Sequence, residues 1–258
     1  MLLVRPFSRF ASKSRLLAAL TVLILALASE VRAGDTNVAV AANFTEPAKE
    51  IAQLFQSSTG HRAILSFGAT GQFYTQITQA APFQVFLAAD EKTPKKLADD
   101  GLGVADSLFT YAIGKLILFS TNATLVTGEQ TLRDAKFNKI AIADPAVAPD
   151  GAAAVETMKK LGLYETLSGK IVQGTDIGQA FQFVDTGSAE IGFVALSEVA
   201  GRSDGSRWIV PANLYNAILQ DAVLLRSGVG NPAAEAFVTF LKGPEARKVI
   251  EKYGYGTQ

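Results

Sequence analysis

The residues that could do chemistry in this chain lie where predicted strands give way to predicted helices. Small or neutral polar residues follow four predicted strands, at 42–45, 68–72, 144–152 and 174–178. A helix start presents free N–H groups and about half a positive charge, so it attracts anions. The Asn43 amide and the Thr70 hydroxyl add neutral donors. We therefore predict a shared anion site at these junctions. Ordinary helix capping is the alternative, since Asn43 and Glu46 also fit a capping box.

The sequence holds no recognisable catalytic arrangement. There is no cysteine, and His61, the single histidine, follows Gly60 and is expected in a solvated turn. A serine–histidine–aspartate triad, a Walker A loop and an HExxH motif are absent, and one histidine cannot build a zinc site. The acidic pairs at 90–91 and 99–100 are expected to cap and solvate a helix. We predict that the protein is not an enzyme and carries no cofactor.

Short apolar runs alternate with helical segments along the chain, which predicts mainly parallel α/β sheets. The predicted strands are 37–42, 62–67, 83–88, 140–143, 170–173, 191–195 and 217–225. The predicted helices are 45–56, 70–79, one from 93, 151–161, 176–185, 232–241 and 245–253.

Two stretches could carry the chain between two sheets. The apolar run 108–120 is too long for one strand and is broken at Gly114 and Lys115, and a second crossing is expected near 208–220. Two crossings suit a hinged protein that closes over a ligand. We expect residues 34–113 with 210–258 to form one lobe and residues 114–209 the other; a single doubly wound domain is the alternative.

The N-terminal segment 1–33 has the three parts of a cleavable signal peptide. A basic region precedes 13 nearly all apolar residues, 16–28, and Val31-Arg32-Ala33 resembles a cleavage site. Thirteen helical residues span about 20 Å, too short for a bilayer core of about 30 Å. We therefore expect export to the periplasm.

The net charge of the exported part indicates which classes of partner it is expected to bind. Residues 1–33 hold five of the 24 basic and one of the 24 acidic residues, which leaves a net charge of −4 on 34–258. A mildly acidic body does not favour nucleic-acid binding. No heptad pattern suggests an obligate interface, so a monomer is expected.

Five stretches in order resemble the periplasmic molybdate-binding proteins of ABC importers. They are AANFTEPAKEIAQLF, SFGATGQFYTQI, PFQVFLAAD, IADPAVAPDGAAAVETMKKLGL and FLKGPEARKVIEKYGY, and the likeness runs from about Val38 to Tyr255. This resemblance implies a two-lobed, hinged α/β fold of the type II periplasmic binding class. It also implies capture of molybdate or tungstate between the lobes, and delivery to an inner-membrane permease driven by an ATPase.

By position, the resemblance places the ligand contacts on Asn43, Thr70, Asp150 and the backbone N–H of Ile177. It implies that Asn43, Thr70 and Ile177 hold molybdate as an oxyanion. Backbone contributions are also expected from Ala42, Ala69, Gly71 and Gly151.

Two positions depart from the pattern of the family. Ala195 stands where some members use a tyrosine, so no hydroxyl comes from it. Members with asparagine at the first junction often carry tyrosine where Asp150 stands. An ionised carboxylate about 4 Å from a dianion would cost about 4 kcal/mol per pair of unit charges at a dielectric near 20. We therefore expect Asp150 to turn out to solvent and cap its helix.

Three alternatives to a molybdate receptor remain open on the sequence. The same fold could take a different oxyanion. It could take a small organic solute whose amine donates to Asp150. It could also be an exported enzyme on that fold, although the missing catalytic groups speak against this.

Overall fold

The computed structural model describes Met1 and residues 33–257. The predicted signal peptide, 1–33, falls outside this part of the chain except for its two end residues. No helix among the described residues has the length and apolar character needed to cross a membrane.

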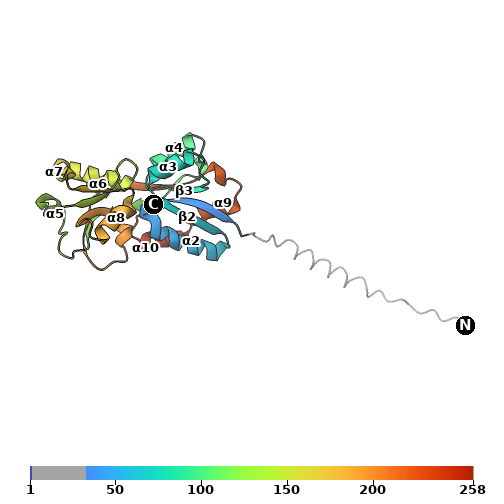
Figure 1. The fold of residues 1–258 in the computed structure, drawn as a ribbon. Helices are drawn as coiled ribbons and strands as arrows, with labels where there is room; N and C mark the ends of the chain where they lie inside the picture. The colour runs from blue at the N-terminus through green and yellow to red at the C-terminus, as the bar shows by residue number, and fades with distance from the viewer. Residues whose placement is uncertain (2–32, 258) are drawn as a thin grey trace. The chain divides into compact units, whose positions relative to one another are not determined.

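Residues 33–257 form two lobes, each built around a five-stranded sheet with helices on both faces (Figure 1). The first sheet has the order β2-β1-β3-β10-β4. Its strands are β1 (Asp35–Ala41), β2 (Arg62–Gly68), β3 (Val85–Leu87), β4 (Phe109–Gly114) and β10 (Ile218–Leu224). The second sheet has the order β7-β6-β8-β5-β9. Its strands are β5 (Leu116–Ser120), β6 (Ile140–Ala143), β7 (Ile171–Gly174), β8 (Ile191–Ala195) and β9 (Ser206–Ile209). This arrangement confirms the predicted two-lobed α/β organisation.

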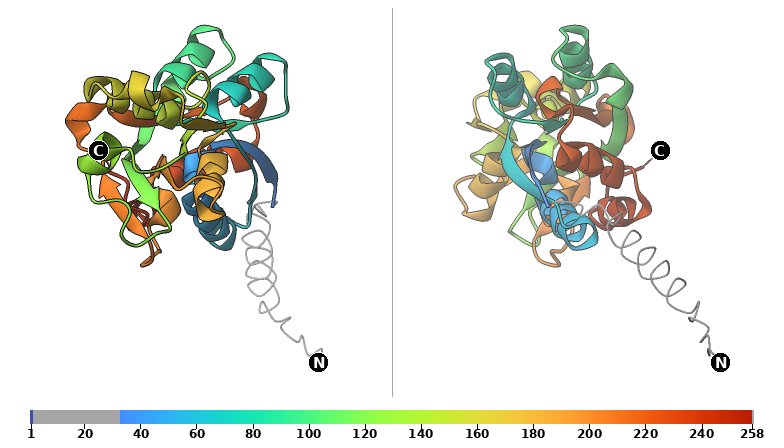
Figure 2. Two further views of the ribbon diagram at one scale, coloured as in Figure 1. Left: turned by 60° about the vertical axis from the view of Figure 1, so that its left-hand side comes forward. Right: turned by 90° about the vertical axis from the view of Figure 1, so that its right-hand side faces the viewer.

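Alternating side chains divide the first sheet between two helical layers. Val38 and Val40 pack with α2 (Thr45–Thr59), α9 (Pro232–Leu241) and α10 (Pro244–Lys252). Ala39 points to the other face, against α3 (Thr70–Thr78) and α4 (Lys92–Asp99). Figure 2 shows the red C-terminal helices beside the blue α2. Because β1 is held from both faces, the loop that follows it is fixed in place.

The second sheet follows the same plan. Leu116 and Leu118 face α6 (Pro149–Lys160), with α7 (Tyr164–Ser168) beyond, whereas Ile117 and Phe119 face α8 (Ile177–Asp185). The short helix α5 (Glu129–Asp134) completes the first of these layers through Leu132. Along the chain, β6 is followed by α6 and β7 by α8, so these two parallel strands position the starts of both helices.

The chain crosses between the sheets where the sequence predicts it. Lys115 separates β4 of the first sheet from β5 of the second, and residues 210–217 return the chain from β9 to β10. The C-terminal segment packs beside the first crossing, since Gly256 pairs with Ile113 near the end of β4. Two crossings of the chain therefore connect the two sheets.

Three sequence predictions about the fold are wrong or incomplete. The sheets are evenly mixed rather than mainly parallel, because β10 and β5 run antiparallel to both neighbours. His61 is 4% exposed instead of solvated: its Nδ1 accepts from the Gly34 N–H at 3.0 Å and its ring stacks on Phe55. The short elements α5, α7 and β9 have no strong periodicity and were not predicted.

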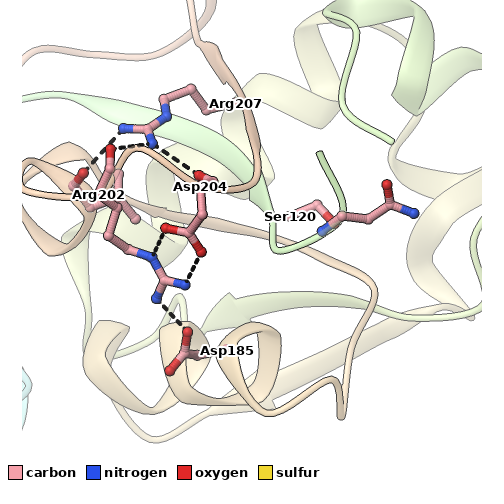
Figure 3. A network of polar contacts seen from close by, with 7 residues as sticks. Ser120, Asp185, Arg202, Asp204 and Arg207 are labelled. Carbon is pink, nitrogen blue, oxygen red and sulfur yellow. Dashed lines mark hydrogen bonds and ion pairs between the residues drawn. The ribbon is translucent and has the colours of Figure 1, made fainter. Parts of the chain in front are cut away.

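An arginine network fixes the loop that leads into β9 (Figure 3). Arg202 donates to Asp204 at 2.6 and 3.0 Å and also pairs with Asp185 at the end of α8. Arg207 donates to the Arg202 carbonyl at 2.8 Å. The network ties α8 to the second sheet, and so stabilises the helix that carries Ile177.

Candidate oxyanion site

The four predicted contact residues meet in one small cavity between the lobes. Asn43, Thr70, Asp150 and Ile177 all line it, together with Ala41, Ala42, Gly68, Ala69, Ala89, Ala148, Pro149 and Asp176. The cavity has a volume of about 10 Å³, which is room for about one water molecule. Residues that are distant in sequence thus converge on a space suited to a small ligand.

Asn43 presents an amide without a protein partner. It lies in the 3-10 helix η1 (Ala42–Phe44) and is 1% exposed, and neither its Nδ2 nor its Oδ1 makes a hydrogen bond to any described residue. The alternative of a capping box is wrong, because no side chain caps η1 or α2 and Glu46 pairs with Lys49. A buried unpaired amide costs stability unless a ligand completes it.

The backbone of Asn43 is held firmly although its side chain is unpaired. Its carbonyl accepts from Ser197 Oγ at 2.7 Å and from the Tyr255 hydroxyl at 2.6 Å. Ser197 belongs to the second lobe, on the 3-10 helix η3 (Leu196–Val199), and Tyr255 packs in the core of the first. These two hydroxyls fix where the free amide sits.

Thr70 is oriented as a donor. It is the first residue of α3, is 2% exposed, and its Oγ1 accepts the Ala89 N–H at 2.9 Å. Because that N–H occupies one lone pair of the oxygen, the hydroxyl hydrogen is left for another acceptor. No described residue takes it, so it is available to a ligand in the cavity.

The prediction that Asp150 turns out to solvent is wrong. Asp150 is the second residue of α6, 2% exposed, and it lines the cavity; the helix has no side-chain cap. Its Oδ1 is buried without a partner, and burial raises the pKa of Asp150 to about 7. A Cβ on the next residue, Gly151, would lie 2.2 Å from the Ala143 carbonyl oxygen. Glycine there lets α6 begin directly against β6, which carries Asp150 inward rather than outward.

Ile177 supplies a helix start. It is the first residue of α8, so its N–H has no acceptor within the helix, and no described residue accepts from it. Asp176 caps the helix by accepting from the Gln179 N–H at 2.9 Å. The capping carboxylate therefore serves its own helix and leaves the Ile177 N–H facing the cavity that both residues line.

The predicted backbone contributions are only partly placed around the cavity. Ala42 and Ala69 line it, but Gly71 and Gly151 do not. The Gly71 N–H donates to the Val147 carbonyl at 2.9 Å, which removes it as a ligand donor. The Ala69 N–H donates a hydrogen bond to Gln72 Oε1 at 3.4 Å.

Several hydrogen bonds hold the lobes together around the cavity, among them one from the Tyr255 hydroxyl to Ser197 Oγ at 3.0 Å. Besides the Gly71 and Ser197 bonds, Gln72 Nε2 donates to the Thr175 carbonyl at 3.4 Å. Each links the first lobe to the second. The structure therefore describes a closed conformer, in which the donors of both lobes already point at one place.

A larger cleft of about 530 Å³ adjoins the small cavity and shares Ala42, Asn43 and Asp176 with it. It runs between α2 and α8, and its lining includes Lys49, Glu198 and Phe67. This cleft gives a solute access to Asn43 from outside.

The charge of the small cavity is unusual for an anion site. None of the described residues that line it is Lys, Arg or His, and two of them, Asp150 and Asp176, are acidic. The available donors are the Asn43 amide, the Thr70 hydroxyl and the Ile177 N–H. Such a set can hold a small oxyanion through directed hydrogen bonds and helix dipoles.

Sequence reasoning missed Ala89, Ser197 and Tyr255, which position the donors rather than provide them. Ser197 and Tyr255 lie 154 and 212 residues from Asn43 along the chain. No local pattern could reveal them, although Tyr255 falls in one of the stretches that carry the family resemblance.

Comparisons with known proteins identify the family of this chain. Residues 36–256 match the family model described as bacterial extracellular solute-binding protein. The chain is 53% identical to the molybdate-binding protein ModA of Rhodobacter capsulatus, over 92% of this chain and 94% of that protein. It is also 53% identical to the molybdate-binding protein ModA of Azotobacter vinelandii, over 96% and 99%. A solved structure, the periplasmic molybdate-binding protein of Azotobacter vinelandii, superposes with a TM-score of 0.84 at 38% identity, covering 86% of this chain and 99% of that one.

Proposed function

This chain belongs to the family of bacterial extracellular solute-binding proteins, and from that premise we propose that it captures molybdate for an ABC importer. The observation that carries the proposal is the convergence of Asn43, Thr70 and Ile177 on one small cavity. Each offers a donor that no described residue uses. A tetrahedral oxyanion has acceptors on every side, so one ion can pair with all three.

The binding energy of such a site is sufficient without a cation. A hydrogen bond to a charged group contributes about 1.5–3 kcal/mol, and micromolar affinity needs about 8 kcal/mol. Three identified donors, with the dipoles of α3, α6 and α8, approach this value. Tungstate shares the shape and charge of molybdate, so we expect it to bind as well.

The size of the cavity favours an ion over an organic solute. A space for about one water molecule in the closed conformer suits a ligand of few atoms better than a metabolite of many. An oxyanion with four oxygens also needs more space than this, so the lobes must stand slightly further apart around the ligand. We infer that the protein binds its solute rather than converting it, in keeping with the other members of its family.

Location and partners follow from the same function. We propose that the segment 1–33 directs export to the periplasm, where a monomer opens and closes between residues 34–113 with 210–258 and residues 114–209. The partner is an inner-membrane permease with its ATPase, which would recognise the closed, loaded form.

Isothermal titration calorimetry with molybdate, tungstate, sulfate and phosphate tests the proposal. We expect a 1:1 stoichiometry for molybdate and tungstate and weaker binding of the two other ions. A protein that gives neither heat nor a thermal shift with any of the four would refute it.

A further inference from the structure

Asp150 is an acid in the lining of a cavity that is proposed to hold an anion. Its carboxyl group is buried, lines the same cavity as the free Asn43 amide, and has an oxygen with no partner. Of the four described residues with unpaired buried side-chain atoms, two are Asn43 and Asp150. The cavity therefore contains two buried polar groups whose hydrogen bonds a ligand would complete, and one of these groups is an acid.

No described residue that lines the cavity of Asp150 carries a positive charge that could compensate an ionised carboxylate. The titratable groups close enough to respond to the charge of Asp150 are Glu198 on η3, Tyr111 on β4, Tyr215 and Tyr255. Asp176, at the start of α8, lines the same cavity. All five are acids or phenols, and none is a cation. The start of α6 and the backbone N–H of Asp150 itself favour the ionised form, but burial outweighs them.

We infer that Asp150 contacts the bound oxyanion as a neutral carboxylic acid that donates its proton, so that capture of one dianion takes up one proton from solvent. The inference rests on the proposed function. A proton from water joins an Asp150 oxygen and then bridges to an oxygen of the ion. No bond of the oxyanion breaks, and Asn43, Thr70 and Asp150 contact its oxygens, not its metal. The unpaired oxygen of Asp150 thereby becomes the fourth donor of the site.

The proton sets how affinity depends on pH. Burial raises the pKa of Asp150 to about 7, so the neutral, binding-competent form dominates below that pH and becomes rare above it. Apparent affinity falls in proportion to the competent fraction. We expect it to change little below about pH 6, and to be about a hundredfold weaker at about pH 9, two units above that pKa.

The experiment compares three forms of the full exported chain by calorimetry with molybdate between about pH 6 and pH 9. Wild type should lose about a hundredfold in affinity over this range and take up about one proton per ion at the alkaline end. Proton uptake is measured by repeating the titration in buffers of different ionisation enthalpy. Asp150→Asn keeps a neutral donor, so its affinity should match wild type within a few-fold at low pH and stay constant at high pH.

Glu198→Gln is the matched control. Burial also raises the pKa of Glu198, but its carboxyl accepts from the Ala195 N–H at 3.0 Å and lines the larger cleft instead of the small cavity. This variant should keep the pH dependence of wild type. A flat profile in wild type, or its loss in Glu198→Gln, would overturn the role of Asp150.

The Asp150→Asn variant and wild type together distinguish a failure of this inference from a failure of the proposed function. If Asp150→Asn folds but binds molybdate at no pH, a neutral donor at this position does not support binding and the inference is wrong, although the wild-type protein remains a molybdate receptor. If wild type fails to bind any of the four oxyanions even at low pH, the proposed function itself fails.

Discussion

Replacing Asn43 by alanine should weaken ligand binding without weakening the fold. In the closed conformer neither atom of the Asn43 amide has a partner among the described residues, and the side chain is 1% exposed. A buried polar group without a partner costs about 1–3 kcal/mol, so its removal relieves a penalty. We expect the free energy of unfolding of the ligand-free variant to equal or exceed that of wild type, less the small cost of the vacated volume.

The affinity should move in the opposite direction. The amide donates one hydrogen bond to a charged ligand, worth about 1.5–3 kcal/mol, so molybdate should bind about ten- to a hundredfold more weakly. The backbone of residue 43 should stay in place, since Ser197 and Tyr255 bind its carbonyl. Calorimetry gives the affinity, and chemical denaturation without ligand gives the stability.

Asn231→Ala is the control for a structural asparagine. Asn231 caps α9 by accepting the Ala233 N–H at 2.9 Å, and its amide donates to the Asp35 carbonyl at 2.9 Å. Its loss should cost about 1 kcal/mol or more of stability and leave affinity unchanged. Should Asn43→Ala behave like this control, melting earlier while binding normally, the assignment of Asn43 to the ligand would be refuted.

Four further outcomes are expected. Thr70→Val should lose both affinity, about ten- to a hundredfold, and stability, about 1–3 kcal/mol, because the Ala89 N–H loses its acceptor; Thr70→Ser should restore both in the same assays. Ser197→Ala removes two bonds between the lobes, to the Asn43 carbonyl and from the Tyr255 hydroxyl, and should weaken molybdate binding in calorimetry by at least about two- to tenfold, equivalent to about 0.5–1.5 kcal/mol for each bond. Small-angle scattering should show a smaller radius with molybdate, and an unchanged curve would contradict closure. Finally, the native pKa of Asp150, about 7 against 3.8 unfolded, means that the folded state holds the extra proton between these values. Stability of the free protein should therefore fall as pH rises from about 4 to 7, by up to about 4 kcal/mol, and Asp150→Asn should lack this contribution in denaturation curves.

Much of the framework could be predicted from the sequence because its signals are local. Regular apolar periodicity marks α2, α9 and the strands β6 and β8, whose observed bounds agree with the predicted ones within a few residues. The break at Gly114 and Lys115 places the first crossing between the sheets. Likewise, a strand that ends before a helix start positions Asn43 and Thr70 at one edge of a sheet.

What the sequence could not predict depends on contacts between distant segments. The direction of the Thr70 hydroxyl is set by Ala89 on the following strand–helix junction, and the place of Asn43 is set by hydroxyls from the far end of the chain. The orientation of Asp150 was predicted wrongly because capping is a local preference. The close approach of Gly151 to Ala143, which directs the helix start inward, is a tertiary constraint.

The unpaired groups of the cavity also explain how a site without cations can favour its ligand. A lysine or arginine would remain well solvated in an open cleft and would attract any anion, chloride included. The Asn43 amide and the Asp150 carboxyl instead have no protein partner when the lobes close empty, so closure alone carries the penalty of burying them. An oxyanion with several acceptor oxygens removes this penalty at each group at once, whereas a monatomic anion cannot reach them all. Closure is thereby coupled to the right ligand, since the energy that stabilises the closed form comes from completing hydrogen bonds that the protein leaves open.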